Sequence, residues 1–388
     1  MGIIIKEINP NNTKELKEFV LLEWEIYKGD PNWVPPLIDE DIKRLNPKTN
    51  PVFKHMEAKY YMAYKDGKPV GRIDAHIDWK YNEIHDENAG FFGFFECIND
   101  KEVAHLLLDQ AVEWLKSKGA EIIYGPMNFN TNDDECGLLI HGFDSPPVVG
   151  MTYNPPYYID LLESYGFQKA KDLVAHIINI DEEFMNFVTR LEARLKPLSE
   201  KAQSYGFTIR NVNLKKLEEE VKIIFDIYND AWEQNWGSLP FEEEEIKHLA
   251  NSLKQIVIPE LAKIVEYNGV PAAFGLIIPD INQILKKLNG RLFPFGFIKF
   301  LTGLKKIDGL RLLALGIKKG YRRKGADSLL YYHLMKDALK MNRFKYCEVS
   351  WLLEDNYLII RATEFMRGKH YKTYRVYRKF ILPQAQAQ

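Results

Sequence analysis

Cysteine is scarce in this sequence, and neither sign of charge is in excess. Only three of its 388 residues are cysteines, Cys97, Cys136 and Cys347, and they are far apart with no CxxC or Cys/His spacing. Neither a disulfide framework nor a zinc site is indicated, so we expect no metal and a reducing, cytoplasmic setting. With 52 basic against 54 acidic residues, no overall field favours nucleic acid as a partner.

Long apolar runs are also missing. No window approaches the roughly 18 uninterrupted apolar residues of a membrane-spanning helix. Residues 1–12 contain a short apolar stretch without the basic region or cleavage site of a signal peptide. This stretch is better explained as a first strand, and we expect no transmembrane segment.

The composition is that of a folded protein large enough for two domains. Hydrophobic residues make up 46% of the chain, and charged residues make up 27%. Such a composition is not that of a mainly disordered chain. Because 388 residues exceed what one hydrophobic core normally supports, two domains are expected.

Hydrophobic periodicity predicts the same order of elements in both halves, β-α-β-β-β-α-β-α-β. Asp66-Gly67 and Asn268-Gly269 each separate two apolar runs and predict tight hairpin turns. An asparagine also precedes a helix-stopping glycine by twelve positions in each half, Asn154 to Gly166 and Asn356 to Gly368. The pattern predicts an α/β fold of two tandem domains, each a mixed sheet flanked by helices.

We place the first domain at residues 1–180 and the second at 207–388. A charged amphipathic helix at 181–206 is expected to link them. The second domain carries an insertion at 282–306, between its third and fourth strands.

A basic turn joins the predicted strand at 310–317 to the predicted helix at 326–340. It contains five basic residues, which are Lys318, Lys319, Arg322, Arg323 and Lys324, and the glycine just before the helix, Gly325. Backbone N–H groups converge at a helix N-terminus, the helix dipole adds positive potential, and glycine lets a phosphate approach the main chain. The turn therefore predicts a phosphate site.

This turn resembles the phosphate loop of the GNAT acyltransferase superfamily, Arg/Gln-x-x-Gly-x-Gly/Ala. The resemblance implies that acetyl-CoA or another acyl-CoA binds through Arg322, Arg323, Lys324, Gly325, Ala326 and Asp327. Asp327 departs from the motif, because it places a carboxylate where Gly or Ala is usual. Its alternative role is that of a first-turn acid favourable to the helix dipole.

The resemblance also implies roles for the fourth and fifth strands. Main-chain groups of Leu315, Gly316 and Ile317 would contact the pantetheine arm and polarise the thioester carbonyl. Asn356, just after the fifth strand, would be a further coenzyme contact, or simply a loop or cap residue.

A direct transfer to an amine needs a proton acceptor close to the nucleophile. The fourth strand contains no acid, so the candidates are Glu348 on the fifth strand and Glu354 and Asp355 just after it. For each, a plain surface role stays open.

The first half lacks the phosphate loop, since residues 94–100 run into the next helix with neither the arginine nor the glycine. We therefore expect it not to bind coenzyme, but to shape the acceptor pocket or to have lost catalysis. Asn128 and Asn130 in its long polar loop are acceptor-pocket candidates, as are Trp232 and Trp236 in the second half. Ordinary packing is the alternative for all four.

The insertion at 282–306 contains six basic residues, no acids and the aromatic sequence Phe293-Pro294-Phe295-Gly296-Phe297. Such a segment predicts either peripheral contact with a membrane or a partner, or packing over its own domain.

Over most of its length the chain resembles tandem GNAT proteins, including uncharacterised bacterial members. Those members share a Gly-Pro-x-Asn loop, an Asn-Pro-Pro-Tyr-Tyr segment and a Lys-x-Tyr-Arg-x-Tyr ending, here at 125–128, 154–158 and 372–377. The resemblance implies an N-acyltransferase acting on a small-molecule or peptide amine. The alternatives are a non-catalytic acyl-CoA or small-ligand binding protein, and an aminoacyl or peptidyl transferase that uses charged tRNA.

Overall fold

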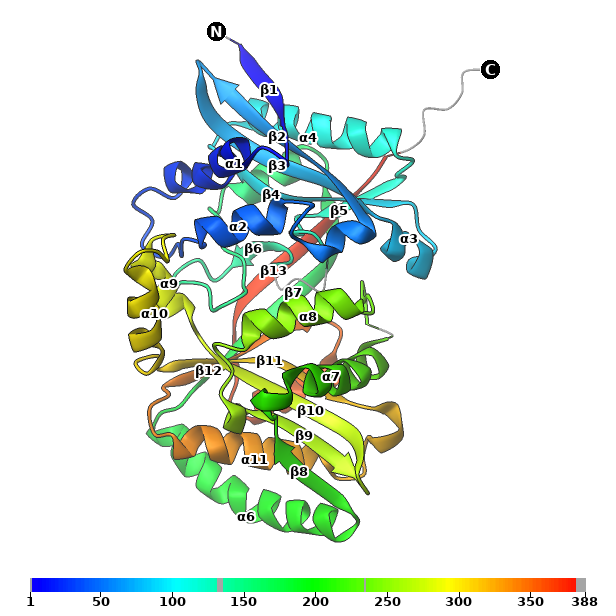
Figure 1. The fold of residues 1–388 in the computed structure, drawn as a ribbon, viewed down its shortest axis with the longest axis vertical. Helices are drawn as coiled ribbons and strands as arrows, with labels where there is room; N and C mark the ends of the chain where they lie inside the picture. The colour runs from blue at the N-terminus through cyan, green and yellow to red at the C-terminus, as the bar shows by residue number, and fades with distance from the viewer. Residues whose placement is uncertain (1, 131–134, 234, 382–388) are drawn as a thin grey trace.

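The structure is a computed structural model that describes residues 2–130, 135–233 and 235–381. Its strands form one mixed sheet that runs through the whole molecule, with helices on both faces (Figure 1). The elements of the first half are β1 (Ile3–Ile8), α1 (Thr13–Ile26), α2 (Ile38–Leu45), β2 (Met56–Lys65), β3 (Lys68–Asp78), α3 (Trp79–His85), β4 (Ala89–Cys97), α4 (Lys101–Ser117), β5 (Ile122–Gly125), β6 (Leu138–His141), α5 (Tyr158–Ser164) and β7 (Gln168–Asn179). Those of the second half are α6 (Glu182–Ser204), β8 (Phe207–Asn211), α7 (Leu217–Trp232), α8 (Glu243–Leu253), β9 (Ala262–Tyr267), β10 (Val270–Pro279), α9 (Asn282–Leu288), α10 (Gly296–Leu304), β11 (Gly309–Ile317), α11 (Ala326–Lys340), β12 (Tyr346–Leu353), α12 (Tyr357–Phe365) and β13 (Lys369–Phe380).

Both predicted hairpins are confirmed. Asp66 and Gly67 join β2 to β3 with φ of 53° and 76°, and Asn268 and Gly269 join β9 to β10 with φ of 49° and 82°. Two successive positive φ values produce the turn whose twist matches that of antiparallel strands, and Asn, Asp and Gly adopt them at least cost. The sequence therefore determines these turns locally.

The last strand of each half pairs with the other half. β7 closes onto β12 of the second half, and β13 pairs with β5 of the first half, while β7 and β13 also pair with each other. Figure 1 shows β13 crossing the centre of the molecule between the two groups of helices. The division at residues 180 and 207 stays a prediction, and the pairing adds that each half is completed by a strand of the other.

Helices cover the two faces of each half differently. In the first half, α4 and α5 pack on one face and α1 and α2 on the other. In the second half, α11 and α6 cover one face and α7 the opposite face. The helix predicted at 181–206 therefore packs along α11 in addition to linking the halves, with Tyr332 of α11 donating a hydrogen bond to Glu192 over 3.2 Å.

The predicted long loop of the first half contains a short strand, β6, that the sequence analysis did not predict. β6 pairs with β13. The Asn154 side chain also binds β6, because it accepts a hydrogen bond from the Leu139 N–H (2.7 Å) and donates one to the Leu139 carbonyl (3.1 Å). Four residues between Gly137 and Gly142 are too few for a recognisable alternation.

Candidate active site

In the second half, the parallel strands β11 and β12 diverge. They pair from Gly309 and Tyr346 as far as Leu312 and Val349, and the pairing then stops. Beyond that point, among the described residues, β11 pairs with β10 on its other edge only. The Leu315, Gly316 and Ile317 predicted to contact the coenzyme lie in this section, whose main chain faces the gap as the open edge of a strand.

The matching gap in the first half is closed by the chain itself. Here β4 and β5 pair at Ala89–Phe91 with Ile122–Tyr124, and the chain that follows β5 continues along β4 in the same direction. The Met127 N–H donates to the Phe92 carbonyl over 2.8 Å, and the Phe94 N–H donates to the Asn128 side-chain oxygen over 2.7 Å. The Gly-Pro-x-Asn loop therefore occupies the strand edge that is open in the second half.

Two tyrosines close the end of the same strand. The Cys97 N–H donates to the Tyr158 hydroxyl over 2.7 Å, and the Tyr157 hydroxyl donates to the Cys97 carbonyl over 2.8 Å. Both belong to the Asn-Pro-Pro-Tyr-Tyr segment. Two of the sequence motifs thus serve to fill the first-half gap.

The basic turn before α11 presents fewer free charges than its sequence suggests. Lys318 pairs with Asp226 over 2.5 Å, and Lys319 pairs with Glu233. Arg322 donates to the Ala231 carbonyl over 3.1 Å and to the Ile317 carbonyl over 3.3 Å.

Arg323 and Lys324 are exposed and form no ion pair within the described residues, so they are the free cations of the turn. Gly325 begins α11 with a φ of 100°, a conformation that favours glycine. The Asp327 carboxylate accepts a bond from the Ser328 N–H over 2.8 Å and so occupies one donor at the helix N-terminus.

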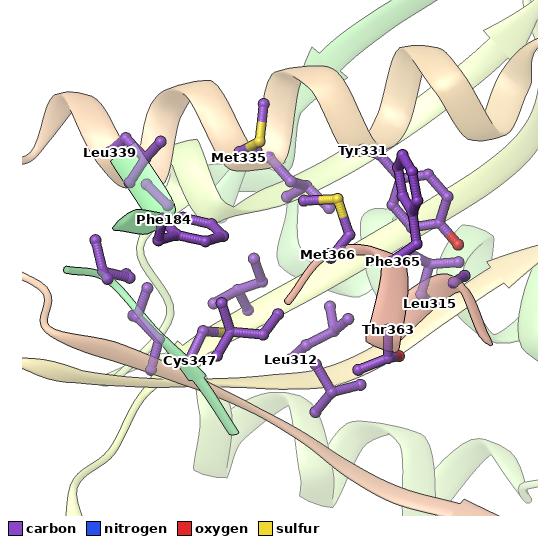
Figure 2. Close-up of a pocket in the computed structure, with 18 of the residues that line it drawn as sticks. Phe184, Leu312, Leu315, Tyr331, Met335, Leu339, Cys347, Thr363, Phe365 and Met366 are labelled. Carbon is purple, nitrogen blue, oxygen red and sulfur yellow. The ribbon is translucent and has the colours of Figure 1, made fainter. Parts of the chain in front are cut away.

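An apolar cavity of about 290 Å³ lies on the α11 face of the sheet, beneath α6 and α12 (Figure 2). Leu312 and Val349, the last pair before the strands diverge, both line it. It extends from Tyr331 and Leu315 at one end to Leu339 and Phe184 at the other. Apart from Tyr331, Cys347 and Thr363, its described lining side chains are hydrocarbon or thioether, which suits an alkyl chain.

A buried polar cluster lies on the opposite face of β12, because successive side chains of a strand alternate. Cys347 and Val349 face the cavity, whereas Glu348 and Ser350 face the other side with Arg311 of β11. The Glu348 carboxylate accepts bonds from the Ser350 and Tyr371 hydroxyls and is 0% exposed. Burial raises the pKa of Glu348 to about 7, and the Arg311 charge opposes this rise.

Arg311 is 1% exposed and binds the cluster together. It donates to the Ser350 hydroxyl over 3.0 Å, to the Ser350 carbonyl over 3.3 Å and to the Val149 carbonyl over 2.7 Å. Val149 belongs to the first half, so the cluster requires both halves.

The exchanged strand β13 and the first-half loop complete this cluster. Lys372 of β13 donates to the carbonyls of Gly142 and, over 2.9 Å, Ser145, and burial lowers its pKa while the Glu348 charge opposes that change. The nearby Tyr374 hydroxyl is buried and has no hydrogen-bond partner in the described part of the chain. The Lys-x-Tyr-Arg-x-Tyr ending thus brings polar groups to Glu348, a role that its sequence did not reveal.

The remaining candidate acids lie at the surface. Glu354 pairs with Lys169 over 2.6 Å and accepts a bond from the Asp172 N–H, and Asp355 pairs with Lys171 over 2.7 Å. Both acids attach the end of β12 to β7.

Asn356 lies at the start of α12 and forms no side-chain capping bond. Trp232 packs on Tyr228 and Phe274 in the second half, whereas Trp236 packs on Tyr124 of the first half.

Asn128 also donates to Glu135 over 2.8 Å, and Asn130 is buried. Asn128 therefore serves within the first half, where Trp236 also packs, while Trp232 belongs to the packing of the second half.

Two absences concern the described residues only. No three acidic, histidine or cysteine side chains among them are arranged to hold a metal ion. None of their helices is both long and apolar enough to cross a bilayer.

The chain is similar to known proteins in sequence and in structure. It is 35% identical over 376 residues to the "Bacterial ceramide synthase" of Caulobacter vibrioides, covering 95% of both chains. It is also 35% identical over 376 residues to "Protein YghO" of Escherichia coli, covering 95% of this chain and 94% of that one. No family model matches it.

Among solved structures, the chain superposes on a tandem GNAT protein from the clavulanic acid biosynthesis pathway. The TM-score is 0.59 at 10% identity, and the match covers 99% of this chain and 100% of that one. A GCN5-related N-acetyltransferase from Sphaerobacter thermophilus gives 0.50 at 12% identity, with 98% and 96% covered. The predicted α/β tandem GNAT fold is confirmed, and the protein belongs to the family of the Caulobacter ceramide synthase and YghO.

Proposed function

We propose that the protein is an N-acyltransferase that moves an acyl group from acyl-CoA directly to an amine. The observation that carries the proposal is the open edge of β11 beside the buried Glu348, at the point where β11 and β12 diverge. The coenzyme phosphates would lie at Arg323 and Lys324, and the pantetheine amides would pair with the β11 edge as an added strand does. The closed β4 edge argues against a second coenzyme site in the first half.

The proposed reaction uses both faces of the sheet, with the acyl chain on the cavity side and the amine on the Glu348 side. An amine approaching from the Glu348 side attacks the thioester carbon, and the β11 main-chain N–H groups stabilise the oxyanion. Glu348 takes the proton that the amine loses as the C–N bond forms. The intermediate then collapses, the C–S bond breaks, and the thiolate leaves and receives a proton.

The donor that fits the cavity best is a long-chain acyl-CoA. The alkyl chain would extend from the carbonyl at Leu312 and Val349 toward Leu339 and Phe184, on hydrocarbon surface throughout. The name "Bacterial ceramide synthase" supports this donor, since a ceramide is a fatty amide of an amino alcohol. Acetyl-CoA, the first expectation from the sequence, is the alternative that the measurements below distinguish.

Removing both free cations of the turn should weaken coenzyme binding. For Arg323→Ala with Lys324→Ala we expect roughly a hundredfold loss of CoA affinity, about tenfold for each charge-assisted contact. Isothermal titration calorimetry with CoA measures it. The control is Lys101→Ala at the corresponding helix start of the first half, where Lys101 pairs with Asp160. No CoA binding by the folded wild-type protein would refute the proposal.

Filling the far end of the cavity should alter donor preference. Ala338 lines that end and is buried, so Ala338→Phe would place a ring where the end of a long chain would lie. We expect kcat/KM for palmitoyl-CoA to fall roughly tenfold or more, while that for short-chain donors stays unchanged. An equal effect on both donors would contradict a chain-length role for this cavity.

A further inference from the structure

The insertion between β10 and β11 exposes a group of large apolar side chains, which we call the 293–301 patch. Its members are Phe293, Phe295, Phe297, Ile298 and Leu301. Phe293 is 68% exposed and Phe295 is 72% exposed. Single exposed apolar residues are ordinary, but five within nine positions indicate an interaction site.

The patch rests on a packed base. Phe300 of α10 is buried together with Ile284 and Leu288 of α9, so the helices have a small core of their own. Phe293 and Phe297 stack with ring centroids 6.3 Å apart. Packing over its own domain therefore accounts for the inner side of the insertion and leaves the 293–301 patch unexplained.

The insertion is also fixed to the first half. The Trp24 indole N–H donates to the Asn289 side chain over 2.8 Å, and the Ile38 N–H donates to the Gly290 carbonyl over 3.1 Å. Figure 1 shows α9 and α10 at the waist of the molecule, beside α2. The insertion starts after β10 and ends at β11, so Leu301, the last residue of the patch, lies ten positions before Arg311 of the buried cluster.

The charged residues of the insertion itself all have one sign. Residues 282–306 include no acid and six basic residues, which are Lys286, Lys287, Arg291, Lys299, Lys305 and Lys306. None of the six forms an ion pair within the described residues, although other lysines pair readily, as Lys318 does with Asp226. Lys286 donates a hydrogen bond to the Pro31 carbonyl, and the other five form no ion pair with described residues. Exposed aromatic rings on a segment whose charged residues are all basic complement a surface that is anionic outside and apolar beneath.

We propose that the 293–301 patch docks the protein on the surface of an anionic lipid bilayer. The rings enter the acyl-chain boundary, and the lysines and Arg291 contact the lipid phosphates while their methylene stems lie along the headgroups. This inference stands on the patch and its charge, and it is independent of the acyl-transfer proposal.

Vesicle co-sedimentation tests it with the full-length protein. We expect binding to vesicles of phosphatidylcholine with phosphatidylglycerol that weakens with added salt, and little binding to phosphatidylcholine alone. The triple change Phe293→Ser, Phe295→Ser and Ile298→Ser should lower the partition coefficient roughly tenfold or more. Lys299→Gln with Lys305→Gln and Lys306→Gln should lower it roughly a hundredfold, on the anionic vesicles only.

The matched control is Trp79→Ser with Ile84→Ser on α3, where both side chains are 47% exposed. It should bind vesicles as the wild type does. Equal binding by the serine triple variant and the wild type would overturn the proposal. So would light scattering that shows a dimer broken by the triple variant, because the patch would then cover a second copy of the chain. Circular dichroism melting verifies that each variant is folded.

Discussion

Replacing Glu348 with glutamine should lower kcat by about a hundredfold to ten-thousandfold, the range that a positioned general base supplies. Glutamine keeps the shape, and its amide oxygen can still accept the bond from one of the two hydroxyls, Ser350 or Tyr371, but the side chain cannot take a proton from the amine. Calorimetry should show unchanged CoA affinity. The measurement is steady-state release of the CoA thiol with acyl-CoA and a primary amine.

The dependence of kcat/KM on pH should also show whether Glu348 is the base. A base must be deprotonated to act, and burial raises the pKa of Glu348 to about 7. The wild-type kcat/KM should therefore rise with pH through about 7, and this rise should be absent from the glutamine variant. Glu354→Gln is the control, since that acid pairs with Lys169 at the surface. A normal rate for the Glu348 variant would assign the base elsewhere.

The free energy of unfolding should also depend on pH through the Glu348 carboxyl, and the direction of this dependence can be predicted. Its folded pKa lies above the ordinary value of 4.5, so the folded protein binds more protons than the unfolded chain between about 4.5 and 7. This group therefore lowers the free energy of unfolding as pH rises across that window. The Glu348→Gln variant should lose this dependence in urea titrations repeated at several pH values.

The sequence predicted best what is determined locally. The hairpin at Asn268-Gly269 and the strand, turn and helix around Gly325 depend on neighbouring residues, and both are present where expected. Its position on the predicted fifth strand also made Glu348 one of three candidate proton acceptors. Only tertiary contacts distinguish it from Glu354, because β13 and the first-half loop bury the first acid and leave the second beside Lys169.

Long-range pairing was beyond the sequence. β7 and β13 carry patterns that fit the edge of either half, so nothing in their own residues specifies the exchange.

The charges of the basic turn also depend on residues that are distant in the sequence. Lys318 and Lys319 resemble phosphate ligands in sequence, yet they are neutralised by Asp226 of α7 and by Glu233 just after it, which are about 90 positions away. Asn128 was predicted to line an acceptor pocket because its sequence neighbours give no sign of its structural partner. That partner is the Phe94 N–H of β4, more than thirty positions earlier in the chain.

Replacing Arg311 with methionine should produce the largest loss of stability, about 3–5 kcal/mol, because it leaves buried acids without their cation. Arg311 is 1% exposed and its charge acts on both Glu348 and Asp280. Its bond to the Val149 carbonyl also joins the two halves. Urea unfolding measures the change. Lys43→Met is the control, because Lys43 pairs with Glu40 where both side chains are exposed, and this pair should contribute about 1 kcal/mol or less.

A methionine variant that fails to fold would leave the charge effect unmeasured, so Arg311→Lys provides the second readout. Lysine keeps the positive charge but lacks the planar fork that reaches Ser350 and Val149 together. The cation should then be held less closely to Glu348, and since Arg311 opposes the rise in the Glu348 pKa, that pKa should increase further. The rise of kcat/KM with pH should move to higher pH by a measurable fraction of a unit. An unshifted profile in a destabilised but folded variant would mean that Arg311 supports the junction of the two halves without tuning the base.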